Sequence, residues 1–244
     1  MSLPIKQIFH HLKHLLFIDI KTVAITSELS LLSQTMQSFW KVKAHRLDPN
    51  QPPELLYQQY AALSSEFGKI ICIAAGYFYL NKNQELSLRV RAFDNTEEKA
   101  LLTQFKELLE TRFSKRTRLV AHNGKRFDFP FLCRRMIIHR ITPPAILQIA
   151  NQKPWEIPHL DTMEMWQFGD RRYAVSLQLL AALFDIPTNS NQWDNATMHE
   201  IFYIKTDYRC ISAWCCNDVK TTAQVYLALQ GFPLLPPQNI IEIT

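Results

Sequence analysis

The sequence predicts an α/β protein in which a mixed sheet is flanked by helices. Two observations support this class: strand-like segments come early in the chain, and strands alternate with helices later. A third is that 47% of the 244 residues are hydrophobic, which suffices for a large core. This composition excludes a disordered chain, a collagen and a disulfide scaffold. We expect one domain that spans residues 1–244.

The first half of the chain supplies most of the expected strands. An apolar run at 15–18 ends at Asp19 and is typical of a buried strand. Leu86, Leu88 and Val90 alternate with polar residues, which indicates a hairpin partner for the apolar segment 69–75. The expected helices are 4–12, 30–40, 55–63 after a proline-rich linker, and 95–109 with Asn95 or Thr96 as its cap.

The second half alternates between strand and helix. A short strand at 118–121 ends in the polar sequence His122-Asn123-Gly124. Helices are expected at 127–138, 176–184 and 207–229, and the last of these is the longest.

Charge and motif content narrow the possible functions. The 27 Lys and Arg residues exceed the 22 Asp and Glu residues by five, which permits an anionic partner. The five cysteines form no C-x-x-C pair, so we expect no zinc site and a reducing, cytoplasmic location. Glycine-rich nucleotide loops and the G-x-S-x-G serine-hydrolase motif are missing from the sequence. There is no apolar run of about 18 residues, and the N-terminal stretch is a poor secretory signal.

Three aspartates are the candidate catalytic groups. Asp19 follows the first strand, Asp128 follows the strand at 118–121, and Asp218 lies in the last helix. Carboxylates in such places hold hard divalent cations, and two cations about 3.5–4 Å apart promote phosphodiester hydrolysis. The alternative from composition alone is that these aspartates are helix caps and solvated charges.

Longer segments carry a family resemblance. Taken in order, they are LLFIDIKTV, FGKIICIAAGYF, LVAHNGKRFDFPFLCRRM, KPWEIPHLDTMEMWQFGD, SLQLLAALFDIP and WCCNDVKTTAQVYLAL. Together they resemble the bacterial family of predicted 3′–5′ exonucleases that are similar to the proofreading domain of family-B DNA polymerases. The resemblance implies a ribonuclease-H-like fold with the first strand in the middle of the sheet and a metal site at its end. It also implies four acidic ligands and a tyrosine, distributed over three motifs.

The resemblance carries over to individual residues. The family motif Asp-Ile-Glu-Thr is here Asp19-Ile20-Lys21-Thr22, and the motif around Asp128 matches fully as His122-Asn123-Gly124-Lys125-Arg126-Phe127-Asp128. The third motif places a tyrosine four residues before an aspartate, and here Trp214 precedes Asp218. The resemblance therefore implies that Asp19, Asp128 and Asp218 are catalytic metal ligands, with Lys21 and Trp214 at altered positions. The implied cofactor is Mg²⁺ or Mn²⁺, bound weakly or not at all.

The two departures change the chemistry of the site. Residues 19 and 21 lie on one face of a strand, so an ammonium replaces a carboxylate beside Asp19. A charged lysine cannot ligate a cation, and we expect Lys21 to stand in for a metal among the aspartates. The alternative is that Lys21 extends to solvent and leaves one metal site open. Trp214 accepts no hydrogen bond and cannot position a nucleophile as a tyrosine does, although simple helix packing also explains it.

The implied partner is the 3′ end of a single-stranded nucleic acid. Asn123, Lys125 and Arg126 are the candidate binding residues because they lie within the second motif. The resemblance to polymerase domains favours DNA over RNA, although no residue pattern separates the two. Other candidates are Arg134-Arg135 and Arg171-Arg172 with the aromatic residues Trp155, Trp166 and Tyr173, although such basic clusters more often form a solvated surface.

Glu28 and Glu66 are possible replacements for the missing glutamate, but neither occupies a motif position. Asp161 is expected to be a turn residue or a helix cap.

Three functions follow from these observations. The first is an exonuclease-family protein with weakened or lost hydrolysis that keeps nucleic-acid binding. The second is an active one-metal exonuclease that uses Asp19, Asp128 and Asp218. The third is a protein-interaction scaffold without chemistry.

Overall fold

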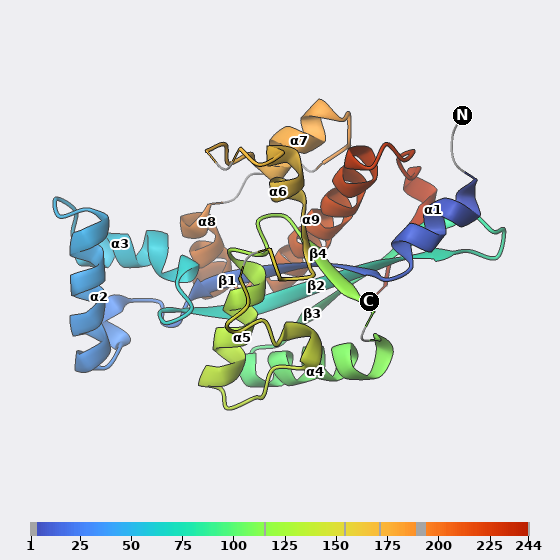
Figure 1. Ribbon diagram of the computed structural model, residues 1–244. Coiled ribbons are helices and arrows are strands. Elements are labelled where there is room, and N and C mark those ends of the chain that lie inside the picture. The colour runs from blue at the N-terminus through green and yellow to red at the C-terminus, as the bar shows by residue number, and fades with distance from the viewer. Residues whose placement is uncertain (1–3, 115, 154, 171, 189–193, 244) are drawn as a thin grey trace.

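The computed structural model describes residues 4–114, 116–153, 155–170, 172–188 and 194–243. Within these residues a six-stranded mixed sheet runs in the order β5-β4-β1-β2-β3-β6, with helices on both faces (Figure 1). The α/β prediction is therefore confirmed.

The bounds of the elements follow the chain. The strands are β1 Leu15–Ala24, β2 Gly68–Leu80, β3 Leu86–Asp94, β4 Arg118–Ala121, β5 Leu160–Asp161 and β6 Ile240–Glu242. The helices are α1 Ile5–Leu12, α2 Gln34–Leu47, α3 Pro53–Tyr60, α4 Glu98–Arg112, α5 Asp128–Ile138, α6 Thr162–Gln167, α7 Leu177–Leu183, α8 Asn195–Glu200 and α9 Tyr208–Leu229.

Strand β1 lies in the interior of the sheet, as the family resemblance implies. It pairs antiparallel with β2 along most of its length, and parallel with β4 over Leu15 to Phe17. The expectation that β1 ends at Asp19 is wrong, because the strand continues to Ala24. Asp19 and Lys21 interrupt the apolar sequence, but they do not end the strand, because hydrogen bonding to β2 continues beyond them. The candidate site therefore lies beside the middle of β1.

The side chains of β1 alternate between two cores. Leu16, Ile18 and Ile20 pack in the cluster that contains α4 and α5. Leu15, Phe17 and Val23 pack in the cluster that contains α1 and α9. This period of two directs the odd-numbered residues, and with them Asp19 and Lys21, toward α9. Figure 1 shows α9 on one side of the sheet and α4 on the other.

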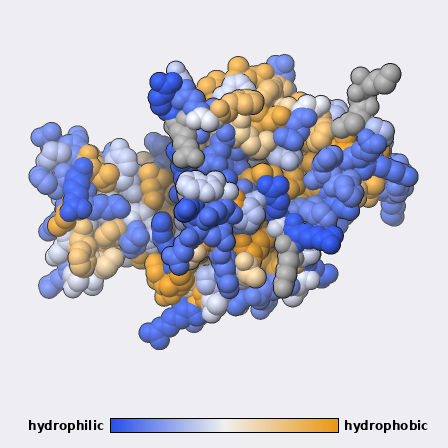
Figure 2. All heavy atoms as spheres, in the orientation of Figure 1, coloured by the Kyte–Doolittle hydropathy of each residue, from blue (hydrophilic) through white to orange (hydrophobic). Residues whose placement is uncertain are grey.

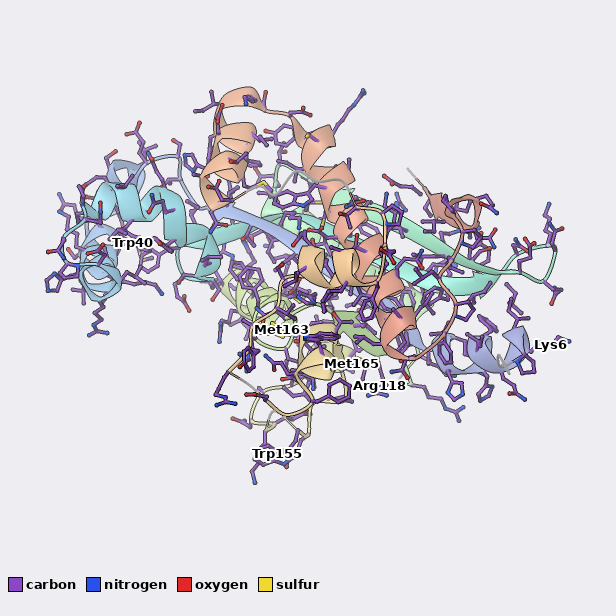
Figure 3. The ribbon with its side chains drawn as sticks, turned by 90° about the horizontal axis from the view of Figure 1, so that it is seen from above. Lys6, Trp40, Arg118, Trp155, Met163 and Met165 are labelled. Carbon is purple, nitrogen blue, oxygen red and sulfur yellow. The ribbon has the colours of Figure 1, made fainter. Side chains whose placement is uncertain are left out.

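Helices α2 and α3 form a lobe with a small core of its own. Trp40 is fully buried there, and its ring meets those of Tyr57 and Phe67 edge-on. The indole N–H of Trp40 donates to the Pro53 carbonyl at 2.8 Å, which satisfies its only donor. The lobe projects to one side of the sheet (Figures 1 and 3).

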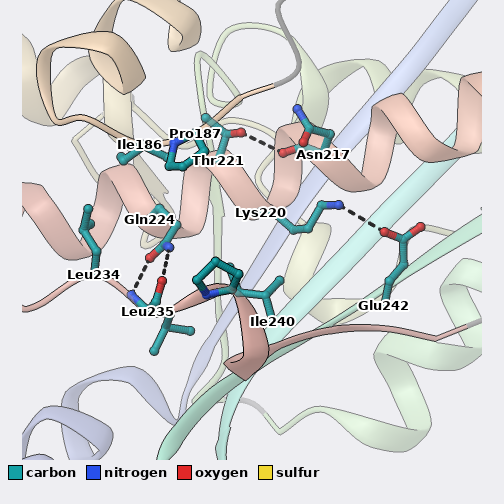
Figure 4. Close-up of a pocket in the computed structure, with 11 residues that line it drawn as sticks. Ile186, Pro187, Asn217, Lys220, Thr221, Gln224, Leu234, Leu235, Ile240 and Glu242 are labelled. Carbon is teal, nitrogen blue, oxygen red and sulfur yellow. Dashed lines mark hydrogen bonds and ion pairs between the residues drawn. The ribbon is translucent and has the colours of Figure 1, made fainter.

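Hydrogen bonds and an ion pair join the C-terminal segment to α9. The Gln224 amide accepts from the Leu235 N–H at 2.9 Å and donates to the Leu235 carbonyl at 2.8 Å (Figure 4). The Lys220 ammonium contacts Glu242 of β6 at 3.1 Å. A cavity of about 320 Å³ lies between these contacts and Ile186. The polar groups of Gln224, Lys220 and Glu242 that border this cavity are thus already engaged with one another or with Leu235.

Several predicted boundaries shift in the structure. The helix expected at 30–40 begins at Gln34, because the Ser33 hydroxyl accepts from the Met36 N–H and caps it. The helix expected from Asn95 begins at Glu98; the Asn95 side chain instead accepts from the Glu97 N–H in a local turn. Elements β5, α6, α8 and β6 were not expected, since each has six residues or fewer and too little periodicity. In the described part of the chain, no helix is long and apolar enough to cross a membrane.

Candidate functional site

The site opens where β1 continues past the end of β4. The last β1 residue that pairs with β4 is Phe17, so the next amides on that edge need other acceptors. The Ile20 N–H donates to Asp128 Oδ1 at 3.1 Å, which joins the start of α5 to β1. Asp128 lies in the first turn of α5, where the helix dipole favours a carboxylate.

Lys21 lies between two of the three aspartates. Its ammonium is 2.8 Å from Asp19 Oδ2 and donates a short hydrogen bond to Asp218 Oδ2. The residue is 8% exposed, so its charge is almost entirely within the protein. The alternative expectation, in which Lys21 extends to solvent, disagrees with this position. Asp218 reaches the ammonium from α9, 197 residues away in the sequence.

Trp214 covers the same ammonium. The Lys21 nitrogen lies 4.1 Å from the centroid of the indole ring, within the range of a cation–π interaction. Trp214 also packs against the core cluster beneath α9. Trp214 therefore both packs in the core and contacts the site, which are the two roles that the sequence left as alternatives.

Cys215 is a site residue that the sequence analysis missed. Its thiol donates to Asp19, with the sulfur 3.2 Å from Oδ2 and 3.3 Å from the backbone oxygen. The available signal was spacing: residues 215 and 218 are three apart in α9 and share a helix face.

Burial and charge shift the acid–base properties of the cluster. Burial raises the pKa of Asp19 to about 6, although the Lys21 ammonium pulls it down. Burial and the charge of Asp19 raise the pKa of Asp128 well above its usual range. For Lys21, burial lowers the pKa, but the carboxylates of Asp19 and Asp218 outweigh it and raise the pKa overall. The ammonium is therefore charged at neutral pH and offers no lone pair to a cation.

The second-motif loop is held by Asp161. One Asp161 oxygen accepts from the Asn123 N–H at 2.9 Å, and the other accepts from the Lys125 N–H at 3.1 Å. The same carboxylate caps α6 by accepting from the Met163 and Glu164 amides, which confirms the expected cap. Asn123 has a φ of 62°, a left-handed conformation that asparagine tolerates better than most residues. Asp161 thus stabilises the turn that leads from β4 to Asp128.

These groups border a shared cavity of about 200 Å³. It is lined on the β1 side by Asp19 and Lys21, and on the loop side by His122, Asn123 and Asp128. Burial lowers the pKa of His122, whose ring bonds to Thr162 Oγ1 and to the Val175 carbonyl. Trp214 also lines the cavity, whereas Asp218 joins the cluster through its contact with Lys21. The remaining lining comes from Ile20, Thr22, Leu63, Phe127, Asp194, Asn195 and Met198.

The expected nucleic-acid contacts differ in their availability. The Lys125 ammonium is engaged with Glu164 at 2.9 Å, whereas Arg126 is exposed beside the cavity residue Phe127. Arg134 is exposed, but Arg135 is only 4% exposed. Arg135 is not the surface residue that the sequence suggested, because its guanidinium pairs with Glu98 inside the protein.

The remaining candidates lie away from the cavity. Trp155 is 73% exposed at the edge of the molecule (Figure 3), and Trp166 packs on Phe184. Tyr173 is exposed beside Arg172, which pairs with Asp170. Arg171 lies outside the described residues.

Neither proposed replacement acid lines the cavity. Glu28 bonds to the Ser30 hydroxyl, and Glu66 bonds to those of Ser64 and Ser65.

The donor set does not fit a two-cation centre. The oxygens of Asp19 and Asp218 that face each other are occupied by the Lys21 ammonium, which cannot be a ligand. Among the described residues, there is no group of three His, Cys, Asp or Glu side chains arranged to hold a metal ion.

Comparison with known proteins identifies the class of fold. One of 70 matching chains of solved structures is the family B DNA polymerase of the hyperthermophilic archaeon Pyrobaculum calidifontis, with a TM-score of 0.50 and 11% identity. The match covers 88% of this chain but only 24% of the polymerase chain. The sheet and its helices thus have the ribonuclease-H-like fold of a polymerase exonuclease domain.

The family is shown by a second comparison. Residues 61–233 match the model of a family described as a predicted 3′–5′ exonuclease related to the exonuclease domain of PolB. The chain belongs to this family, and a nucleic acid is the class of substrate that the family relation implies. No curated protein matches the sequence.

Proposed function

We propose that this chain is a 3′–5′ exonuclease-family protein whose hydrolytic step is severely weakened and which retains binding to single-stranded nucleic acid. The observation that carries the proposal is the position of the Lys21 ammonium between Asp19 and Asp218. In the family, Asp19, Asp128 and Asp218 would be the acidic ligands of Mg²⁺ or Mn²⁺. Such cations would activate the attacking water and stabilise the leaving oxygen.

The ammonium weakens cation binding in two ways. It fills the space between two ligand oxygens, and its positive charge repels a second cation at short range. A cation at this position would have to displace Lys21 from contacts with two carboxylates and an aromatic ring. The displaced Lys21 ammonium would have few other positions to occupy, because the residue is buried and belongs to an interior strand of the sheet.

Trp214 weakens the reaction separately. Its indole accepts no hydrogen bond, so it cannot orient a water molecule as a phenol oxygen does. Its ring also occupies part of the cavity wall above Lys21. Because such groups act as a unit, both replacements together cost orders of magnitude in rate.

Residual nucleic-acid binding would depend on the rim of the cavity. The carboxylates of Asp19 and Asp218 repel phosphate unless a cation lies between them, and Lys21 supplies only one positive charge against the two. Arg126, exposed on the second-motif loop, is the best placed phosphate contact, and Asn123 lines the cavity behind it. We propose the 3′ end of single-stranded DNA as the ligand, in keeping with the polymerase relationship of the family.

One observation favours a second candidate, an exonuclease that uses a single cation. Asp128 lines the cavity, and Lys21 contacts Asp19 and Asp218 rather than Asp128. A cation held by Asp128 and the outer oxygen of Asp19 would leave the ammonium in place.

One assay separates the two candidates. Single-stranded DNA and RNA carrying a 5′ label are incubated with Mn²⁺ or with EDTA, and the products are resolved on a sequencing gel. We expect the native protein to leave both intact, and the variant Lys21→Glu with Trp214→Tyr to shorten at least one of them from the 3′ end. Adding Asp218→Asn to that variant is the control and should abolish shortening. Shortening by the native protein that stops in EDTA would support the one-cation enzyme instead.

Binding is measured in the same samples. A gel shift at low salt, reduced by Arg126→Ala and by added salt, is expected because phosphate contacts release counterions. If the native protein shifts neither strand, the retained-binding part of the proposal is wrong.

A further inference from the structure

A second surface lies apart from the site, between α2 and α5. It is a groove of about 930 Å³, which we name the α2–α5 groove. It shares no lining residue with the site cavity. Figure 2 shows hydrophobic atoms on the lower part of the α2–α3 lobe and over α5, on either side of it. Its apolar lining is Ile25, Met36, Phe39, Val42, Phe67 and Ile138.

The groove exposes large apolar side chains at helical spacing. Phe39 is 62% exposed and Val42 is 55% exposed, and the two are three residues apart on α2. Ile138, at the end of α5, is 51% exposed. Single exposed apolar residues are ordinary, but a contiguous patch with a concave floor marks an interaction surface.

The charges around the groove are mostly of one sign. Helix α2 contains Lys41, Lys43 and Arg46 but no Asp or Glu, and residues 129–153 contain no Asp or Glu either. Lys43, Arg46 and Arg135 line the groove together with one carboxylate, Glu66. The rim is therefore net positive.

The acid in the groove does not cancel this charge fully. The Ser64 hydroxyl links Glu66 to Lys43, since it donates to Glu66 at 2.6 Å and accepts from the Lys43 ammonium at 3.0 Å, so these two charges offset each other. Arg135 is neutralised by Glu98, but Arg46 is exposed at the rim. An apolar floor beside an exposed cation complements a ligand with an apolar face and acidic flanks.

We infer that the α2–α5 groove binds an acidic amphipathic helix of a partner protein. Such a helix would place apolar side chains at i, i+3 and i+4 against Phe39, Val42 and Ile138. Its carboxylates would lie near the exposed guanidinium of Arg46. Nucleic acid is the weaker candidate, because the floor of the groove is apolar and presents no row of cations to a phosphate backbone.

The test uses defined peptide probes and the whole 244-residue chain. Two fluorescein-labelled helical peptides carry leucine at the same i, i+3, i+4 and i+7 positions, with glutamate flanks in one and lysine flanks in the other. Fluorescence anisotropy measures their binding to native protein and to Phe39→Ser with Val42→Ser. The matched control is Leu179→Ser with Leu183→Ser, which removes two apolar side chains of similar exposure from α7.

The proposal predicts saturable binding of the glutamate peptide alone. The α2 variant should weaken it by about tenfold or more, the α7 control should bind normally, and Arg46→Glu should weaken it and improve binding of the lysine peptide. Equal binding of both peptides, or no binding of the glutamate peptide at high concentration, overturns the proposal. So does a native dimer that the α2 variant abolishes in sedimentation, since the occupant is then a second copy. Oligonucleotide binding that depends on Phe39 would overturn it as well.

Discussion

Replacing Lys21 by methionine should convert the site into one that depends on a divalent cation for stability. Methionine keeps the apolar stem and removes the ammonium, so Asp19 and Asp218 lose their shared partner. Removing one partner of a buried ion pair costs about 3–5 kcal/mol. For a chain of this size each kcal/mol lowers Tm by roughly 2–4 °C, so the expected loss in EDTA is roughly 6–20 °C.

A cation should restore much of that loss. At a concentration 100 times its Kd, a ligand adds about 2.7 kcal/mol, which corresponds to roughly 5–11 °C. Differential scanning fluorimetry with EDTA or MnCl₂ measures both effects. The native protein should respond to Mn²⁺ far less than the variant, because its ammonium already supplies the positive charge.

A surface lysine provides the matched control. Lys205 contacts Glu200 at 2.9 Å, but both side chains are about half exposed, and such pairs contribute about 0–1 kcal/mol. Lys205→Met should therefore change Tm little and create no response to Mn²⁺. The reasoning is refuted if Lys21→Met is as stable as the native protein in EDTA, or if Mn²⁺ stabilises the two equally.

Three further predictions concern the scaffold around the site. Burial lowers the pKa of His159 to about 4, and the His159 Nδ1 accepts a hydrogen bond from the Leu119 N–H. Between pH 6.5 and 4, His159 therefore binds a proton in the unfolded chain but stays neutral in the folded chain. The free energy of unfolding should fall over this range as pH decreases, and His159→Gln should remove about 3 kcal/mol of that fall in urea titrations. Asp161→Ala should cost about 3 kcal/mol in the same titrations, because four backbone amides lose their charged acceptor. Gly124→Ala should cost about 1–3 kcal/mol, since the new Cβ would lie 2.4 Å from the Ala121 side chain.

Each of these predictions has a contrary result. An unchanged pH slope in His159→Gln would show that other groups account for the acid sensitivity. Asp161→Asn should be milder than Asp161→Ala, because it keeps one acceptor oxygen; equal losses would contradict the hydrogen-bonding argument. A Gly124→Ala protein as stable as the native one would mean that the turn yields without cost.

The sequence predicted the elements that have strong local signals. The strand at 118–121 and the helix at 127–138 agree with β4 and α5 to within a residue, because a short apolar run and a helical period mark them. The extension of β1 beyond Asp19 had no local signal, since it depends on pairing with β2. The short elements β5 and α8 were missed for the same reason: tertiary contacts stabilise them.

The site was predicted only as far as motifs and alternation allow. Because side chains alternate along a strand, the sequence predicted that Asp19 and Lys21 share one face, and in the structure both side chains point toward α9. Distance in the sequence hid two other contacts. Arg135 pairs with Glu98, which lies 37 residues earlier, and Cys215 meets Asp19 from 196 residues away. A basic residue and a cysteine have too many possible partners for the sequence to select one.

The most direct test is to titrate Mn²⁺ into the native protein at pH 7.5. Calorimetry and electron paramagnetic resonance then measure how many Mn²⁺ ions the aspartate cluster binds and how tightly. The account predicts no tight stoichiometric uptake by the native chain, and uptake once Lys21→Glu with Trp214→Tyr is introduced. Tight binding of two Mn²⁺ ions by the native protein would contradict the claim that the ammonium of Lys21 stands in for a metal.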